Sequence, residues 1–311
     1  MHPTIWLENS KTDDATAACP ICESVLPRKE FALIQKEPAI GLLKCKSCKA
    51  ASVSRNPKPE VLDQYYAQYR YDGGQDNSQV TFQGASRFAK HLMKMLEKNI
   101  TVGNSLRILD FGGGDGALAI ALSKLFKNVE IVITVVDYER VSSDQELPHN
   151  VSIRHIRELE KATDLNDIVL ASAVMEHIPK PGKVFKDLVD RTKVGGCIYV
   201  RTPFIGPQMK LLHCIDKLLG SSLSTKRGFG FPAHMHDMGP AFWIQVGDSL
   251  GLPVKTIISQ PSIPQLQLST RFLRALASYA FKLPAYIEVR LGHKIPWWGF
   301  SGGWEAVLLK Q

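Results

Sequence analysis

Four of the six cysteines in this 311-residue chain stand in two closely spaced pairs. Cys19 and Cys22 form one C-x-x-C motif, and Cys45 and Cys48 form the second. Each motif is typical of a tight turn that directs two thiolates at one ion, and two such turns complete a tetrahedral Zn²⁺ site. Because the protein would supply all four ligands, the pattern predicts a structural zinc site rather than a catalytic one.

A glycine-rich run from Asp110 to Gly116 is the second motif with chemical potential. It follows a short apolar run and precedes a helical pattern, so we expect a turn from a buried strand into a helix N-terminus. Glycines allow the backbone to approach a ligand closely, and the helix N-terminus offers unpaired N–H groups. Asp137 ends the next predicted strand, where its carboxylate would accept hydrogen bonds from ribose hydroxyls. Alone, this pattern also satisfies the dinucleotide motif G-x-G-x-x-G/A.

Apolar runs and helical patterns alternate through the middle of the chain. The alternation predicts a parallel sheet covered on both faces. Strands are expected at 106–111, 129–137, 151–156, 167–172, 196–202, 254–259 and 303–310, and helices at 82–99, 117–126, 182–192 and 240–250.

Three motifs in this order resemble those of class I S-adenosylmethionine-dependent methyltransferases. The run 110–116 reads D-x-G-x-G-x-G, which is similar to motif I of that family. Residues 167–179 end in Glu-His-Ile-Pro and resemble the fourth-strand motif, and residues 194–200 resemble the Gly-Gly turn into the fifth strand. The resemblance implies an α/β, Rossmann-like sheet of seven strands, mostly parallel with the last strand antiparallel, preceded by a small zinc ribbon or knuckle.

The resemblance also implies roles for individual residues toward S-adenosylmethionine. Tyr138 would lie beside the adenine, and Ser172 and Ala173 would face the reactive centre. Arg87 is a weaker candidate for the cofactor carboxylate, since a surface role is more common. The remaining cofactor positions are Asp110, Gly112, Gly113, Gly114 and Gly116 around the methionine part and Asp137 at the ribose.

The paired cysteines narrow the resemblance within the family. Bacterial sugar and natural-product methyltransferases, a group similar to those of ubiquinone biosynthesis, combine an N-terminal zinc-binding segment, a tyrosine-rich linker and a class I core. In that group the zinc segment helps to cover the acceptor pocket. The alternative is an RNA methyltransferase that reads phosphates with the basic residues near the knuckle. Those residues are Lys44, Lys46, Lys49, Arg55 and Lys58.

Histidines are the candidates for removing a proton from the acceptor, because their pKa lies near neutrality. His177 follows the fourth strand beside Glu176, and His234 and His236 precede the next predicted helix. Asp237 is expected to orient a histidine. Some relatives bind a divalent metal through E-x-x-E-H, but Ala173 occupies the first position here, so a catalytic metal would need His234 or His236 as a further ligand.

We expect four regions: a zinc-binding segment at 15–60, a tyrosine-rich linker with N-terminal helices at 61–100, a methyltransferase core at 101–260 and 301–311, and a basic, apolar insertion at 261–300. The insertion is expected to pack on the core, cap the acceptor or form a dimer interface, with peripheral membrane contact as the alternative. We expect a monomer or homodimer in the cytoplasm, since no apolar stretch reaches the roughly 18 residues of a membrane span.

The net charge of +8 favours an anionic partner, such as a sugar nucleotide, a lipid-linked glycan or, less favoured, RNA. Two further alternatives are an NAD-dependent enzyme and a non-enzymatic interaction protein. The intact glycine run and Asp137 argue against the non-enzymatic alternative.

Overall fold

The computed structural model describes residues 5–71, 84–138, 146–221, 225, 229–263 and 272–311, without the side chains of 67–71 and 272–279. The predicted turn Asp72-Gly73-Gly74 and the start of the predicted helix at Phe82 lie outside these residues, as does Arg271.

A seven-stranded sheet forms the centre of the protein, in the order β10-β11-β8-β7-β4-β5-β6. Five neighbouring strands are parallel, and β11 runs antiparallel to both β8 and β10. This arrangement confirms the predicted Rossmann-like sheet. The strands are β4 (Ser105–Phe111), β5 (Glu130–Val136), β6 (Val151–Ile156), β7 (Asn166–Ser172), β8 (Thr192–Thr202), β10 (Val254–Pro261) and β11 (Trp304–Lys310).

Helices cover both faces of this sheet, as the apolar strands require. The helices α2 (Ala85–Leu96) and α3 (Ala117–Ser123) bury one face. The helix α4 (Pro181–Asp190) covers the other face together with α7 (Pro240–Trp243) and α8 (Val246–Leu250). The single helix predicted at 240–250 is therefore two short helices. Short 3₁₀ turns occur at Asn9–Lys11, Leu159–Lys161 and Met175–His177.

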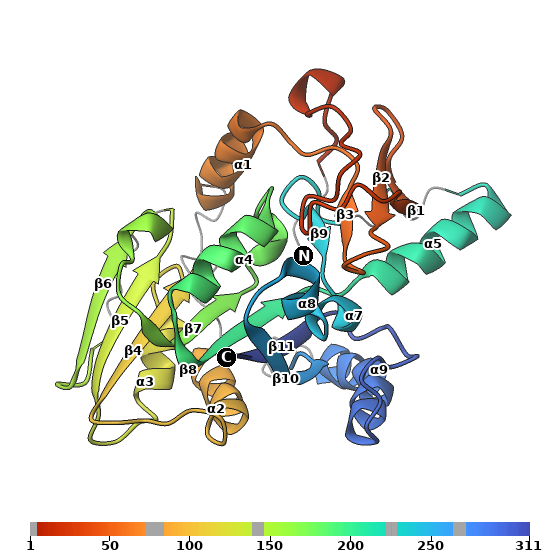
Figure 1. Ribbon diagram of the computed structural model, residues 1–311. Helices are drawn as coiled ribbons and strands as arrows, with labels where there is room; N and C mark the ends of the chain where they lie inside the picture. The colour runs from red at the N-terminus through yellow and green to blue at the C-terminus, as the bar shows by residue number, and fades with distance from the viewer. Residues whose placement is uncertain (1–4, 72–83, 139–145, 222–224, 226–228, 264–271) are drawn as a thin grey trace.

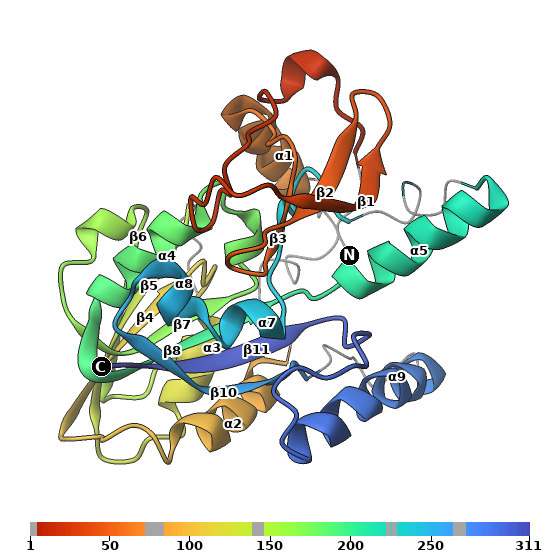
Figure 2. The same cartoon turned by 45° about the vertical axis from the view of Figure 1, so that its right-hand side comes forward.

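A second, four-stranded antiparallel sheet carries the cysteine pairs. It consists of β1 (Lys29–Gln35), β2 (Ile40–Lys44), β3 (Ala51–Val53) and β9 (His236–Asp237), in that order. The fourth strand comes from far along the chain, with Ser52 paired to His236. Figures 1 and 2 both show this sheet standing above one end of the large sheet, with β9 running between them. The small sheet is thus completed by a strand that lies between α5 and α7 in the sequence, far from β1–β3.

Three further helices flank the small sheet and the C-terminal edge. The helix α1 (Pro59–Tyr71) begins where we expected a tyrosine-rich linker, and α5 (Gly206–Leu219) was not anticipated. The helix α9 (Phe272–Arg290) occupies most of the basic, apolar insertion. Figure 2 shows α5 and α9 projecting from the same side of the molecule. Among the described residues, no helix is both long and apolar enough to cross a membrane.

Candidate active site

The glycine loop lies at the carboxyl end of β4 and leads directly into α3. Gly112, Gly114 and Gly116 all have positive φ, between 57° and 78°, which L side chains rarely adopt. A Cβ at Gly112 would lie 2.5 Å from the Val174 side chain, so the loop also requires glycine for space. The loop is therefore built as predicted, with its backbone directed toward the carboxyl edge of the sheet.

Two carboxylates flank this loop. The Gly114 N–H donates to Asp137 Oδ2 at 2.8 Å, which holds the acid against the loop. Asp110 is only 2% exposed, and its Oδ2 has no hydrogen-bond partner among the described residues. Burial, followed by the nearby charge of Asp137, raises the pKa of Asp110 to about 7. A backbone hydrogen bond from Ala119 partly opposes this rise, and the unpartnered Oδ2 of this buried acid fits a cationic ligand such as S-adenosylmethionine, which carries a sulfonium and an ammonium group.

The other predicted cofactor residues lie at neighbouring strand ends. Tyr138 follows β5 and is 68% exposed, and the side-chain oxygen of Ser172 is buried without a partner among the described residues. Ala173 adopts φ +57°, and its N–H donates to the Arg201 carbonyl at 2.7 Å. Arg87 is half-buried, with its guanidinium 5.2 Å from the centre of the Phe88 ring. These positions are untested and stay predictions.

A cluster of Glu176, His177 and His234 lies just beyond β7. One candidate ligand atom from each residue falls within 4.8 Å of the others. The Met235 N–H donates to the Glu176 carbonyl at 2.9 Å, and this bond brings the distant histidine segment to the end of β7. The structure thus brings together two of the three predicted histidines.

Both histidines of this cluster contact backbone carbonyls through Nδ1. His177 Nδ1 lies 3.0 Å from the Ala233 oxygen and 3.1 Å from the Tyr66 hydroxyl, and His234 Nδ1 lies 3.1 Å from the Phe229 oxygen. A carbonyl oxygen can only accept a hydrogen bond, so Nδ1 of each ring must carry the proton. In the neutral imidazole the lone pair of each ring is then on Nε2. This tautomer is the one that a base or a metal ligand needs.

Glu176 completes the cluster from the buried side. Its Oε1 lies 3.7 Å from His177 Nε2, and its Oε2 has no hydrogen-bond partner among the described residues. Burial raises the pKa of Glu176 to about 8, although the charge of Arg201 opposes the rise. The side chain is therefore mostly protonated at neutral pH.

His236 and Asp237 take positions different from those expected. His236 is 1% exposed, and its Nε2 donates to the Ile178 carbonyl at 2.8 Å. Burial lowers the pKa of His236 to about 4, so it remains neutral. Asp237 was expected to orient a histidine. Its Oδ1 instead accepts the backbone N–H groups of Ile205 at 2.7 Å and Gly206 at 3.1 Å, at the start of α5.

The four paired cysteines converge as their spacing predicts. Their sulfur atoms all lie within 4.8 Å of one another, with Cys19 and Cys48 3.8 Å apart and Cys22 and Cys45 3.7 Å apart. Tetrahedral thiolates at a Zn–S distance of about 2.3 Å stand about 3.8 Å from one another. The donor set and the spacing therefore fit a zinc ion.

Residues 81–235 match the family model described as "Methyltransferase domain". This match covers the glycine loop, Asp137 and the Glu176–His177 segment, and the sheet around them has the strand order described above. Residues 81–235 are a class I methyltransferase domain.

The ubiquinone biosynthesis O-methyltransferase of Coxiella burnetii is 28% identical to this chain over 114 residues. The match covers 35% of this chain and 48% of the relative, so the chain spans about half the length of the curated relatives that it matches. The predicted zinc-binding segment at 15–60 and the insertion at 261–300 both lie outside residues 81–235, which match the family model.

Solved structures with a similar fold include two methyltransferases bound to S-adenosylhomocysteine. Plantazolicin methyltransferase BamL is 16% identical, with 80% of this chain and 91% of that chain covered and a TM-score of 0.44. Coclaurine N-methyltransferase is 13% identical, with coverages of 71% and 70% and a TM-score of 0.41. At these scores the assignment of the methyltransferase domain rests on its own strand order and motifs.

Sequence reasoning named Lys44, Lys46 and Lys49 as basic residues near the cysteines but missed the cavity of about 620 Å³ that they line together with distant residues, which is described below. It also missed Tyr66, whose hydroxyl reaches His177 from α1. Pro59 at the first turn of α1, followed by Leu62, Tyr65 and Tyr66 at helical spacing, is the signal that would have placed this tyrosine on a helix.

Proposed function

We propose that this protein transfers a methyl group from S-adenosylmethionine to a small-molecule acceptor, which is a sugar or a glycan precursor. The observation that carries the proposal is the pair of acids, Asp110 and Asp137, held against a glycine loop at the carboxyl edge of the sheet. This edge is where α/β sheets bind their ligands.

S-adenosylmethionine, when bound, supplies a methyl group on a positively charged sulfur. Asp137 would accept hydrogen bonds from the ribose hydroxyls, while its Oδ2 also accepts the Gly114 N–H. Asp110 would place a negative charge near the methionine part. The glycine loop would allow the backbone to approach the cofactor, as its positive φ angles permit. These residues bind and orient, and alignment is the larger part of catalysis for a displacement reaction.

The acceptor proton would be taken by Nε2 of His177 or His234. Backbone carbonyls fix both rings in the tautomer with a lone pair on Nε2. An imidazolium formed on His177 would lower the pKa of the nearby Glu176 below about 8, so that this carboxyl would release its proton to solvent and its negative charge would stabilise the imidazolium. The alternative role for the same three residues is to hold a divalent metal.

We also propose a structural zinc ion at Cys19, Cys22, Cys45 and Cys48. The 3.7 and 3.8 Å separations of the sulfur pairs support it. Burial raises the pKa of the Cys22 thiol to about 11, so zinc binding would have to displace its proton.

The test is isothermal titration of the zinc-loaded protein with S-adenosylmethionine and, separately, with NADH. We expect one site for S-adenosylmethionine and none for NADH. Absence of S-adenosylmethionine binding would refute the proposal, and binding of NADH alone would favour an oxidoreductase. A methyl-transfer assay against sugar acceptors, with RNA as the competing substrate class, then identifies the acceptor.

A further inference from the structure

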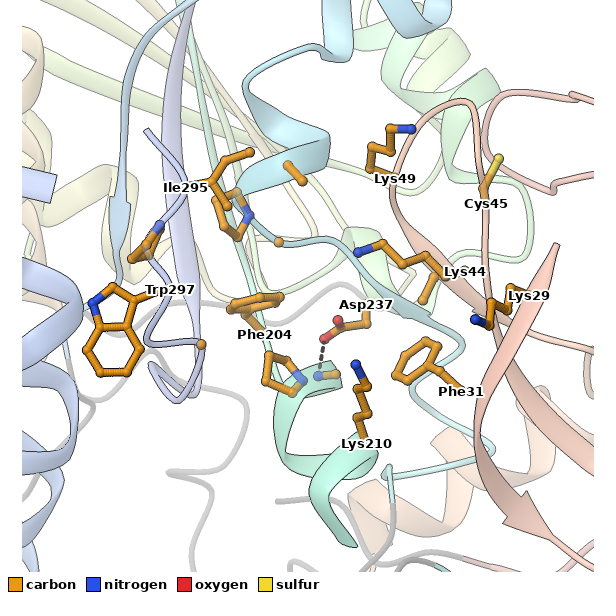
Figure 3. A pocket seen from close by; sticks show the side chains of 18 of the residues that line it. Lys29, Phe31, Lys44, Cys45, Lys49, Phe204, Lys210, Asp237, Ile295 and Trp297 are labelled. Atoms are coloured by element: carbon orange, nitrogen blue, oxygen red, sulfur yellow. Dashed lines mark hydrogen bonds between the residues drawn. The ribbon is translucent and has the colours of Figure 1, made fainter. Parts of the chain in front are cut away.

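A cavity of about 620 Å³ lies between the zinc-bearing sheet, the start of α5 and the segment after α9. Five lysines line it: Lys29, Lys44, Lys46, Lys49 and Lys210. One carboxylate, that of Asp237, lines it as well. Figure 3 shows the ammonium groups of Lys44 and Lys210 extending toward the space around Asp237.

The lysine charges in this cavity are not matched by acids. Over the part of the chain that the structure describes, no carboxylate lies within 4.0 Å of any of the five ammonium groups. Asp237 Oδ1 is engaged by the Ile205 and Gly206 N–H groups. The five lysines are solvent-exposed, so their charges are solvated without a ligand, but together they favour a multiply charged anion over a single carboxylate.

The opposite wall of the cavity is aromatic and apolar. It contains Phe204, Trp297 and Phe300, together with Pro207 and Ile295. Figure 3 shows the rings of Phe204 and Trp297 on the side away from Lys49 and Lys29. Trp297 is 78% exposed and Ile295 is 57% exposed, so this wall presents neighbouring apolar side chains to the solvent. The cavity thus pairs a basic half with a half suited to a flat ring or an apolar chain.

The backbone that carries Trp297 and Trp298 is held in place. The buried Glu288 of α9 accepts the Trp297 N–H at 2.6 Å and the Trp298 N–H at 3.3 Å. Gly299 packs so closely that an added Cβ would lie 2.6 Å from Pro207, on α5. The two walls are therefore held apart by packed elements, and the cavity is formed before any ligand arrives.

The cavity is also close to the reacting region. Asp237 lies three residues after His234, and an extended chain spans at most about 3.6 Å per residue, so their Cα atoms are within about 11 Å. A sugar ring attached to a ligand in the cavity can span a distance of this order. The cavity is therefore placed to hold one end of an acceptor whose other end is methylated.

We propose that this cavity binds a diphosphate joined to an aromatic or apolar group, and that this is the anchoring part of the acceptor. The lysines hold the phosphate oxygens, while Phe204 and Trp297 contact the attached group. The role of this diphosphate as part of the acceptor rests on the proposed function, whereas its binding in the cavity does not. Two sources share this chemistry, a nucleoside diphosphate and an isoprenyl diphosphate.

The test is titration calorimetry of the zinc-loaded full chain with uridine diphosphate, geranyl diphosphate and inorganic pyrophosphate. We expect at least one organic diphosphate to bind more tightly than pyrophosphate, and the tighter of the two identifies the source. Lys210→Gln should weaken binding about tenfold, since one charge-assisted contact is lost. Lys217→Gln, on the same helix but outside the cavity, should have no effect.

Trp297→Ala provides the second arm, because it should weaken the organic diphosphate but leave pyrophosphate unchanged. Failure of all three probes to bind, or equal losses in the Lys210 and Lys217 variants, would overturn the inference. Displacement of the bound diphosphate by a short RNA would also overturn it. Titration of the same samples with S-adenosylmethionine separates the two proposals. If S-adenosylmethionine does not bind but an organic diphosphate does, only the proposed methyl transfer is contradicted.

Discussion

The proposed cofactor region and the proposed acceptor region of this protein are built in different ways. The first uses consecutive pieces of chain: β4, the glycine loop, α3 and β5 follow one another from residue 105 to residue 136. The second collects residues from three distant segments, namely β1–β3, residues 204–239 and residues 295–300. The comparison teaches that the methyl donor can be inferred from a short stretch of sequence, whereas the acceptor site exists only in the folded chain.

The largest effect should come from the proposed zinc site, because zinc there would hold together the sheet that carries four of the cavity lysines. Cys48→Ser removes a buried ligand and should cost about 3 kcal/mol of stability or more. We expect zinc loss and a lower Tm, with organic diphosphate binding reduced more than S-adenosylmethionine binding. Cys214→Ser, at an exposed position on α5, is the control. Full zinc content and an unchanged Tm in Cys48→Ser would contradict the assigned ligand set.

His177→Ala tests the junction of the two regions. It removes a proposed base and should lower kcat by about 10²- to 10⁴-fold, with little change in the Kd for S-adenosylmethionine. His149→Ala, at an exposed position near β6, is the matched control. Activation by added Mg²⁺ or Mn²⁺ that disappears in His177→Ala would instead assign the cluster to metal binding. An unchanged kcat would exclude both roles.

Asp137→Ala tests the cofactor region alone. It removes the acceptor of the Gly114 N–H and the proposed ribose contacts, so S-adenosylmethionine should bind about 100-fold more weakly. Asp164→Ala, whose carboxylate forms half-exposed ion pairs, should bind normally. Calorimetry measures both. Equal affinities in the two variants would show that the predicted ribose site is wrong.

Gly182→Ala tests how tightly the two regions are packed together. An added Cβ on α4 would lie 1.9 Å from the Ile21 carbonyl oxygen, inside the first cysteine turn. We expect a loss of about 2 kcal/mol of stability, because the backbone must shift. Urea unfolding measures the loss, and Gly103→Ala, which meets nothing within 4 Å, serves as the control. If Gly182→Ala were as stable as Gly103→Ala, the cysteine turn at Ile21 would be able to move away from α4 at no cost.

The smallest effect concerns pH. Burial raises the pKa of Asp110 to about 7, so the unliganded protein holds an extra proton below that pH, and its stability falls as pH rises from about 4 to 7. A cationic cofactor favours the ionised acid. The affinity for S-adenosylmethionine should therefore decrease about tenfold from pH 8 to pH 6. Asp110→Asn should flatten this dependence, and an equal slope in that variant would assign the proton elsewhere.

The predictable part of the fold is the part set by local pattern. Continuous apolar runs placed the strands of the large sheet to within a few residues, and the two C-x-x-C motifs placed the thiols. These features depend on neighbours in the sequence. The local motif also identified the Glu176–His177 segment, but it left open whether His234 or His236 lies beside it; the structure places His234 there.

The rest depends on contacts that no local pattern contains. Asp237 was expected to orient a histidine, but its Oδ1 instead caps a helix that begins at Gly206. The sequence shows Lys44, Lys46 and Lys49 only as basic residues near the cysteine pairs, and the pairing of β3 with β9 places them beside Asp237 in one cavity. Their chemistry follows from proximity, which becomes visible only in the structure.

The pairing of Ser52 with His236 also sets an order of events during synthesis. A chain that emerges from the ribosome N-terminus first can gather its four cysteines early, but the edge of β3 stays open until residues 236–237 arrive. An open edge is a site for wrong pairing with other strands. The small sheet therefore completes only after β4 to β8 of the large sheet have been made and before β10 and β11 follow, and early zinc binding at the proposed site would stabilise the half-finished small sheet during this interval.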